Sequence, residues 1–158
     1  MPDANRHRVL VISSNNDVSN ELVTLLSGYG YFVEYCQNRI EGMRKFRAHK
    51  QPIVIVDSNV LRLFPKRLFG FIRRVRKNTI VLIAAGKKDE SDAVENLALG
   101  AYDLLHLPLK TDLLRVTLNR AIAHHRLTLE NLFVKNFVFF GLLMMPVWLM
   151  LLYCILRR

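Results

Sequence analysis

Residues 51–59 read QPIVIVDSN, in which four consecutive β-branched residues are followed directly by an acid. A run that is apolar at every position is typical of a strand buried on both faces, as in a parallel sheet. Similar short runs recur before and after this one. The predicted strands are 9–12 (VLVI), 32–35 (FVEY), 53–56 (IVIV), 80–84 (IVLIA) and a minimal fifth strand at 104–105 (LL).

Between these runs, apolar residues recur every three or four positions, as in helices that pack on a sheet. The predicted helices have apolar positions over 18–29, 40–46, 68–75, 94–98 and 113–122. Ser91 and Thr111 are expected N-caps, and glycines follow the first and fourth helices. This alternation predicts an α/β fold with a doubly wound, five-stranded parallel sheet. Such sheets place their sites at the carboxyl ends of the strands.

The other end of the chain has a different composition. Residues 137–156, FVFFGLLMMPVWLMLLYCIL, contain no charged residue. Twenty helical residues cover about 30 Å, the thickness of a bilayer's hydrocarbon core. We therefore predict a long helix that leaves the domain and enters a single transmembrane helix. The expected parts are a domain over 1–126, a helical linker over 127–136, the transmembrane helix over 137–156 and a basic tail over 157–158.

The eight residues before the first predicted strand contain no apolar leader, so no signal peptide is predicted. We therefore expect a tail-anchored, single-pass protein of the bacterial inner (cytoplasmic) membrane, with its domain in the cytoplasm.

The region from about residue 8 to residue 126 resembles a bacterial response-regulator receiver domain of the CheY-like type. The likeness rests on three stretches: VLVISSNNDVSNELVTLLSGYGY at 9–31, QPIVIVDSN at 51–59, and ESDAVENLALGAYDLLHLP at 90–108. It implies a flavodoxin-like fold and a role in two-component, phosphorelay signal transduction. It also implies that Asp57 stands at the position of the family's phospho-acceptor.

The resemblance fails at the other positions that carry the family's chemistry. In the family an acidic pair after the first strand holds Mg²⁺, a threonine or serine follows strand four, and a lysine follows strand five. The degenerate positions in this chain are Ser13, Ser14, Ala85 and Leu107. Mg²⁺ requires anionic oxygen ligands, and phosphoryl transfer relies on positioning and charge neutralisation. We therefore predict a pseudo-receiver with no catalytic residue, no metal and no cofactor, in which Asp57 is hydrogen-bonded to backbone or to Ser13 or Ser14.

Positive charge is concentrated in the middle of the chain, although the whole chain carries a formal charge of +10. Residues 39–77 hold twelve Lys and Arg against two acids. These cations are Arg39, Arg44, Lys45, Arg47, Lys50, Arg62, Lys66, Arg67, Arg73, Arg74, Arg76 and Lys77. They predict a basic surface on two neighbouring helices. That surface could contact anionic lipid headgroups, an acidic protein partner or solvent alone. Nucleic acid is a less favoured partner, because no nucleic-acid-binding module is recognisable.

The remaining reactive residues suggest no further site. Cys36 and Cys154 lie far apart and form no disulfide or zinc pattern, and Cys36 is expected in the core. His124 and His125 are adjacent, so on a helix they point in different directions.

The leading hypothesis is a non-enzymatic, membrane-anchored signalling or scaffold module that binds another signalling protein, or a second copy through the surface that includes Leu97, Leu104 and the helix from Thr111. One alternative is a phosphorelay receiver that takes phosphate on Asp57 from a histidine kinase and uses Mg²⁺. A second alternative is a basic, membrane-tethered nucleic-acid-binding protein.

Overall fold

The structure, a computed structural model, describes residues 8–62 and 64–123 of the 158-residue chain. Its centre is a five-stranded parallel sheet in the order β2-β1-β3-β4-β5. The strands are β1 (Arg8–Ile12), β2 (Phe32–Cys36), β3 (Ile53–Asp57), β4 (Ile80–Ala85) and β5 (Asp103–His106). The predicted α/β architecture and all five predicted strands are confirmed, and each strand differs from its prediction by no more than one residue at either end.

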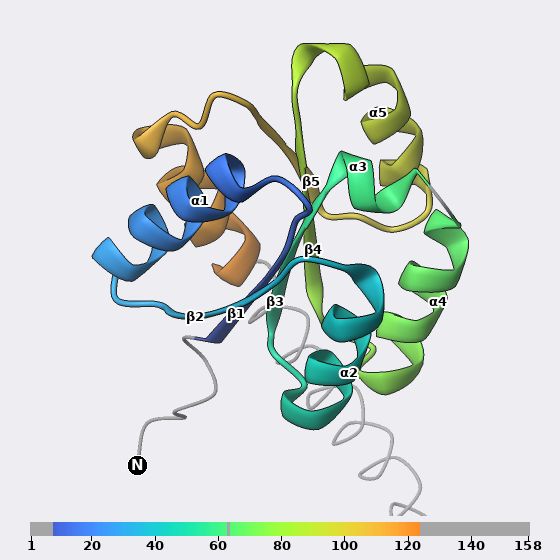
Figure 1. The fold of residues 1–158 in the computed structure, drawn as a ribbon. Helices are drawn as coiled ribbons and strands as arrows, with labels where there is room; N and C mark the ends of the chain where they lie inside the picture. The colour runs from blue at the N-terminus through green and yellow to red at the C-terminus, as the bar shows by residue number, and fades with distance from the viewer. Residues whose placement is uncertain (1–7, 63, 124–158) are drawn as a thin grey trace, which may run out of the picture. The chain divides into compact units, whose positions relative to one another are not determined.

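Helices cover both faces of this sheet (Figure 1). They are α1 (Asn16–Gly28), α2 (Arg39–His49), α3 (Ser58–Leu61), α4 (Pro65–Val75), α5 (Glu90–Ala98) and a last helix over 111–123. Figure 1 shows α1 and the last helix on one side of the sheet and α2, α4 and α5 on the other. Because both faces are covered, every residue of β3 and β4 is buried, which explains their unbroken apolar runs.

Successive residues of each strand point to opposite faces, so the strands contribute to two apolar layers. The layer beneath α2 and α4 contains Leu10 and Val54 of the sheet together with Phe46 and Ile72 of the helices. The rings of Phe46 and Phe71 meet edge to face, with centroids 6.4 Å apart. This contact joins α2 to α4, which confirms the prediction that these two helices are neighbours.

Two short elements at the carboxyl edge were not predicted. One is α3, directly after β3, and the other is the 3₁₀ turn η1 (Lys87–Asp89), directly after β4. Neither has apolar periodicity; α3 begins because the carboxylate of Asp57 accepts a hydrogen bond from the Asn59 N–H. A pattern based on apolar spacing does not detect turns of this kind.

Both predicted N-caps were wrong by a small displacement. Since η1 leads directly into α5, that helix begins at Glu90, and Ser91 lies inside it. The last helix begins at Thr111 itself, and the Leu114 N–H bonds the carbonyl of Lys110. The expected helix ends after Gly28 and before Gly100 are confirmed, and Gly100 has the positive φ of 111° that closes such an end.

Several sequence predictions fall outside the described residues. They are the domain boundary at 126, the linker over 127–136, the transmembrane helix over 137–156, the tail over 157–158 and the pair His124 and His125. Within 8–62 and 64–123, none of the helices combines the length and apolar character needed to cross a bilayer.

Candidate functional site at the carboxyl edge of the sheet

The carboxylate of Asp57 ends β3 and is 98% shielded from solvent, since its residue is only 2% exposed. One oxygen, Oδ2, accepts a hydrogen bond of 2.9 Å from the Ser13 hydroxyl. The other, Oδ1, accepts from the Asn59 N–H at 3.2 Å and lies 3.4 Å from the hydroxyl of Ser58. Both oxygens are therefore used inside the fold, as predicted from the loss of the acidic pair.

Sheet order brings Ser13 to this carboxylate. β1 lies between β2 and β3, and Ile12 is in register with Val56, so the residue after β1 lies beside the end of β3. Ser13 is buried, and its oxygen also accepts from the Asn15 N–H at 3.1 Å. Ser14 is exposed. The two serine positions thus have different roles, a distinction that sequence reasoning did not make.

The donor set does not fit Mg²⁺. This cation takes near-octahedral oxygen coordination and is usually held by one or two carboxylates whose oxygens are available. Here one buried carboxylate is already occupied by a hydroxyl and a backbone N–H, and its closest partner, Ser13, is neutral. Across the described part of the chain, no three His, Cys, Asp or Glu side chains come together as a possible ligand set.

The other two degenerate positions lie at the same edge. Ala84 is the register partner of Asp57, and Ala85 follows it with its side chain buried. The Leu107 N–H donates to the Ala85 carbonyl at 2.9 Å, and the Leu107–Pro108 peptide is cis. The fold therefore brings Ser13, Asp57, Ala85 and Leu107 to one edge, but the latter two supply neither a hydroxyl nor a cation to this edge.

A second polar group at this edge was missed by sequence reasoning. The Ser58 hydroxyl lies between two carboxylates, 3.4 Å from Asp57 and 3.4 Å from Asp89 of η1. Arg62 then pairs with Asp89 at 3.0 Å. These contacts connect α3 to η1 beside the end of β3. The sequence DSN at 57–59 signals a capped turn, but no local pattern links it to Asp89, which lies about thirty residues farther along the chain.

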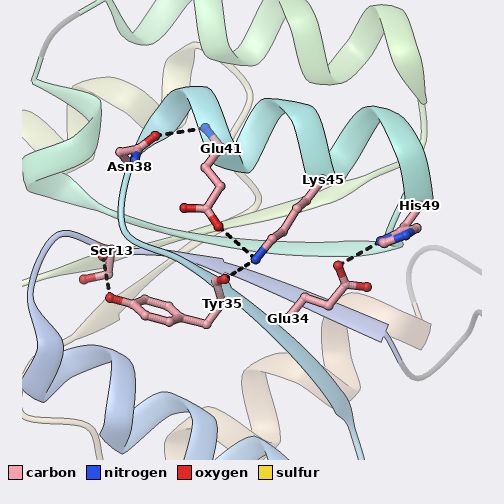
Figure 2. Close-up of polar contacts among 7 residues, drawn as sticks. All are labelled: Ser13, Glu34, Tyr35, Asn38, Glu41, Lys45 and His49. Carbon is pink, nitrogen blue, oxygen red and sulfur yellow. Dashed lines mark hydrogen bonds and ion pairs between the residues drawn. The ribbon is translucent and has the colours of Figure 1, made fainter.

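The predicted basic surface is divided by the structure. Lys45 points toward β2, where its Nζ donates to the Tyr35 carbonyl at 2.7 Å and pairs with Glu41 at 3.0 Å (Figure 2). The hydrogen bond with Glu41 raises the pKa of Lys45. Arg76 donates to the carbonyl of Lys50, and burial lowers its pKa. Together with Arg62, these cations serve contacts inside the fold.

The same view shows how α2 is held on the edge strand β2. Asn38 caps the helix by accepting from the Glu41 N–H at 2.9 Å, and His49 at the far end lies 2.8 Å from the carboxylate of Glu34 (Figure 2). The hydroxyl of Tyr35 donates to the Ser13 carbonyl at 3.3 Å. The helix that carries four of the twelve basic residues is thereby oriented at both ends.

Comparisons with known proteins agree with this fold. No protein-family model matches the sequence. The chain is 31% identical over 120 residues to the transcriptional regulatory protein ZraR of Klebsiella oxytoca, an alignment covering 76% of this chain and 27% of that protein. It is 25% identical over 126 residues to the nitrogen assimilation regulatory protein NtrX of Azorhizobium caulinodans, covering 78% and 28%. The chain thus spans about a quarter of the length of these relatives.

Among solved structures, a response regulator receiver domain protein from Clostridium thermocellum superposes with a TM-score of 0.69 at 24% identity. That alignment covers 77% of this chain and 98% of the other. The described residues therefore have the receiver fold, and the sequence is similar to response regulators. The predicted resemblance is confirmed at this level.

Proposed function

We propose that this chain is a pseudo-receiver, a signal-transduction module that binds a partner protein and does not accept phosphate on Asp57. The observation that carries the proposal is the 2.9 Å hydrogen bond from Ser13 to Asp57. It occupies the oxygen that points toward the end of β1, where a working receiver needs its metal ligands.

The charge balance supports the same conclusion. Transfer of a phosphoryl group to a carboxylate brings two anions together, so it depends on cations placed around the transferred group. At this edge Ser13 and Ser14 are neutral, and Ala85 and Leu107 are apolar. Arg62, at the end of α3, is paired with Asp89. The phosphorylated form of Asp57 would therefore lack both the metal and the fixed cation that stabilise it.

The proposed module is anchored in the bacterial inner membrane by the helix predicted over 137–156. The support for the anchor is the uncharged twenty-residue run in the sequence. The proposed partner is another signalling protein or a second copy of the chain. Exposed apolar side chains on α5 and the last helix, Val94, Leu113 and Val116, suit such a contact.

A phosphorelay receiver is the second candidate function. It is favoured by the similarity to response regulators and by the location of Asp57 at the end of the third strand. In that case a histidine kinase would donate the phosphoryl group, and an Asp57 oxygen would have to leave Ser13 or Asn59 before attacking phosphorus.

One experiment separates the two functions. The full chain, in detergent or nanodiscs, is incubated with Mg²⁺ and acetyl phosphate, and intact mass spectrometry measures addition of a phosphoryl group. We expect none for the native chain. A variant that restores the missing charges, Ser13→Asp with Ser14→Asp and Leu107→Lys, is the positive comparison, and the same variant with Asp57→Asn is its control.

Phosphorylation of the native chain that disappears with Asp57→Asn alone would overturn the pseudo-receiver proposal and establish the second candidate. Labelling of the restored variant but not of the native chain would support the proposal directly, because it would show that the missing charges are the cause.

A further inference from the structure

The outward surface of α2 and α4 carries cations without carboxylate partners. In the described part of the chain, eight exposed Lys and Arg residues there form no ion pair with a carboxylate: Arg44, Arg47, Lys50, Lys66, Arg67, Arg73, Arg74 and Lys77. The two acids within residues 39–77 do not compensate for them. Glu41 pairs with Lys45, and Asp57 is buried. We call these eight residues, with Arg39, Ile40 and Phe64, the α2–α4 face.

Helical spacing aligns these cations. On α2, Ile40, Arg44 and Arg47 follow each other at intervals of four and three residues, so they form one stripe. On α4, Arg67 and Arg74 lie seven residues apart, so they form one stripe on the side of the helix away from the buried Leu68, Phe69 and Ile72. Because the two helices pack side by side through Phe46 and Phe71, the stripes belong to one continuous surface.

Phe64 stands where the two helices begin and is 55% exposed. Its backbone is left-handed, with φ 64° and ψ 55°, a conformation that a bulky residue rarely adopts. The guanidinium of Arg67 lies 4.9 Å from the ring centroid, and that of Arg39 lies 5.7 Å from it. Ile40, the next residue on α2, is 71% exposed. The face therefore combines cations with two projecting apolar side chains, and strained backbone of this kind is commonest at functional sites.

We propose that the α2–α4 face binds the surface of a bilayer that contains anionic lipid. The Lys and Arg side chains contact the headgroups, and Phe64 and Ile40 enter the boundary with the acyl chains. Cations together with two isolated apolar side chains favour lipid over an acidic protein. A bilayer is deformable and anionic over its whole surface, so the apolar side chains can insert while the cations contact headgroups. A pocket of about 440 Å³ lies away from this face, beside Tyr29 and Arg115. The helix predicted over 137–156 would hold the chain at a bilayer, which would raise the effective concentration of lipid available to the α2–α4 face. The inference does not depend on the chemistry of Asp57.

The test uses the full chain with a fluorophore that reports on the face itself. An environment-sensitive probe is attached through K66C, next to Phe64, or through N20C on α1 as a control on the other side of the sheet. Both carry Cys154→Ser, and the native Cys36 is too buried to react. Each protein is mixed with vesicles of phosphatidylcholine, with or without phosphatidylglycerol. We expect a blue-shifted emission at position 66 with the anionic vesicles, reduced by salt, and no lipid-dependent change at position 20.

Matched variants identify the groups responsible. Each cation removed is expected to weaken the affinity for anionic vesicles, measured from the emission shift at position 66, about fivefold. Arg44→Gln with Arg47→Gln should therefore weaken that affinity roughly 25-fold. Lys87→Gln with Lys88→Gln, in the exposed turn η1, removes the same charge away from the face and leaves the response unchanged. Phe64→Asn keeps a residue that tolerates left-handed backbone and weakens the part of the response that resists salt.

Three outcomes would overturn the inference: equal emission at position 66 in both kinds of vesicle, equal losses from the α2 pair and the η1 pair, or a response to a random DNA duplex or polyglutamate without one to anionic lipid. The last outcome would assign the face to nucleic acid or to an acidic protein.

Discussion

The hydroxyl of Ser13 donates a 2.9 Å hydrogen bond to the carboxylate of Asp57, although 44 residues separate them in the sequence. Both residues are buried, and both lie at carboxyl ends of adjacent parallel strands. A neutral hydroxyl thus occupies the side of Asp57 where the receiver resemblance implies an acid and a metal. In the proposed pseudo-receiver, this bond stabilises the fold and at the same time withdraws the carboxylate from phosphate chemistry.

Ser13→Ala is therefore expected to destabilise the protein by about 1–3 kcal/mol, because it leaves a buried carboxylate oxygen without its partner. Urea unfolding of the full chain in detergent measures the change. Ser14→Ala is the matched control, since Ser14 is exposed, and we expect its effect to stay within about 0.5 kcal/mol. Equal effects of the two substitutions would contradict the role given to Ser13.

The two substitutions Asp57→Asn and Asp57→Ala should differ. An asparagine keeps an oxygen that caps α3 by accepting from the Asn59 N–H, whereas alanine loses both the cap and the 2.9 Å hydrogen bond from the Ser13 hydroxyl, which keeps only its contacts with the Asn15 backbone. The loss of an N-cap costs about 1 kcal/mol and the loss of a hydrogen bond about 1 kcal/mol more. We expect thermal unfolding to show Asp57→Ala as the less stable variant. If asparagine were as damaging as alanine, the negative charge of Asp57 would be structurally required.

At Gly42, α2 lies too close to the sheet for a side chain to fit without a shift. An added Cβ would lie 2.5 Å from Cδ1 and 2.9 Å from Cγ1 of the buried Ile12. Gly42→Ala should destabilise by roughly 1–3 kcal/mol through overpacking, despite the better helix propensity of alanine.

Gly70 on α4 provides the comparison for Gly42, because nothing lies within 4 Å of its added Cβ. Gly70→Ala should stabilise by about 0.5–1 kcal/mol, since only helix propensity changes. Changes of the same sign in both variants would show that α2 can move away from β1 without cost.

Cys36 should make stability depend on pH in the alkaline range. Burial raises the pKa of its thiol from 9.0 to about 11. The folded chain therefore keeps the proton that the unfolded chain releases, and stability falls as the pH rises from about 9 to about 11. The expected loss is roughly 2–3 kcal/mol. The difference between the native chain and Cys36→Ala in urea unfolding at pH 8 and pH 11 isolates this contribution from other groups; a constant difference would contradict it.

Much of the candidate site was predictable from the sequence, because it depends on the local apolar pattern and on one general rule about parallel sheets. The apolar runs identify buried strands, and the rule that sites lie at the carboxyl ends of parallel strands selects Ser13, Asp57, Ala85 and Leu107. The missed residues, Ser58 and Asp89, belong to short turns without periodicity. Their contact depends on the order of β3 and β4 in the sheet, which no local pattern contains.

The basic surface shows the same limit on a single helix. Arg44 and Lys45 are adjacent and equally basic, yet Arg44 faces solvent, and Lys45 turns toward β2 and bonds the Tyr35 carbonyl. The sequence alone determined the composition of this surface, the α/β alternation and the residues at the strand ends, because apolar periodicity and charge are local properties. The tertiary structure decided which cations remain unpaired and which partner holds Asp57, because those contacts require strand order, register and helix orientation to bring distant residues within hydrogen-bond distance.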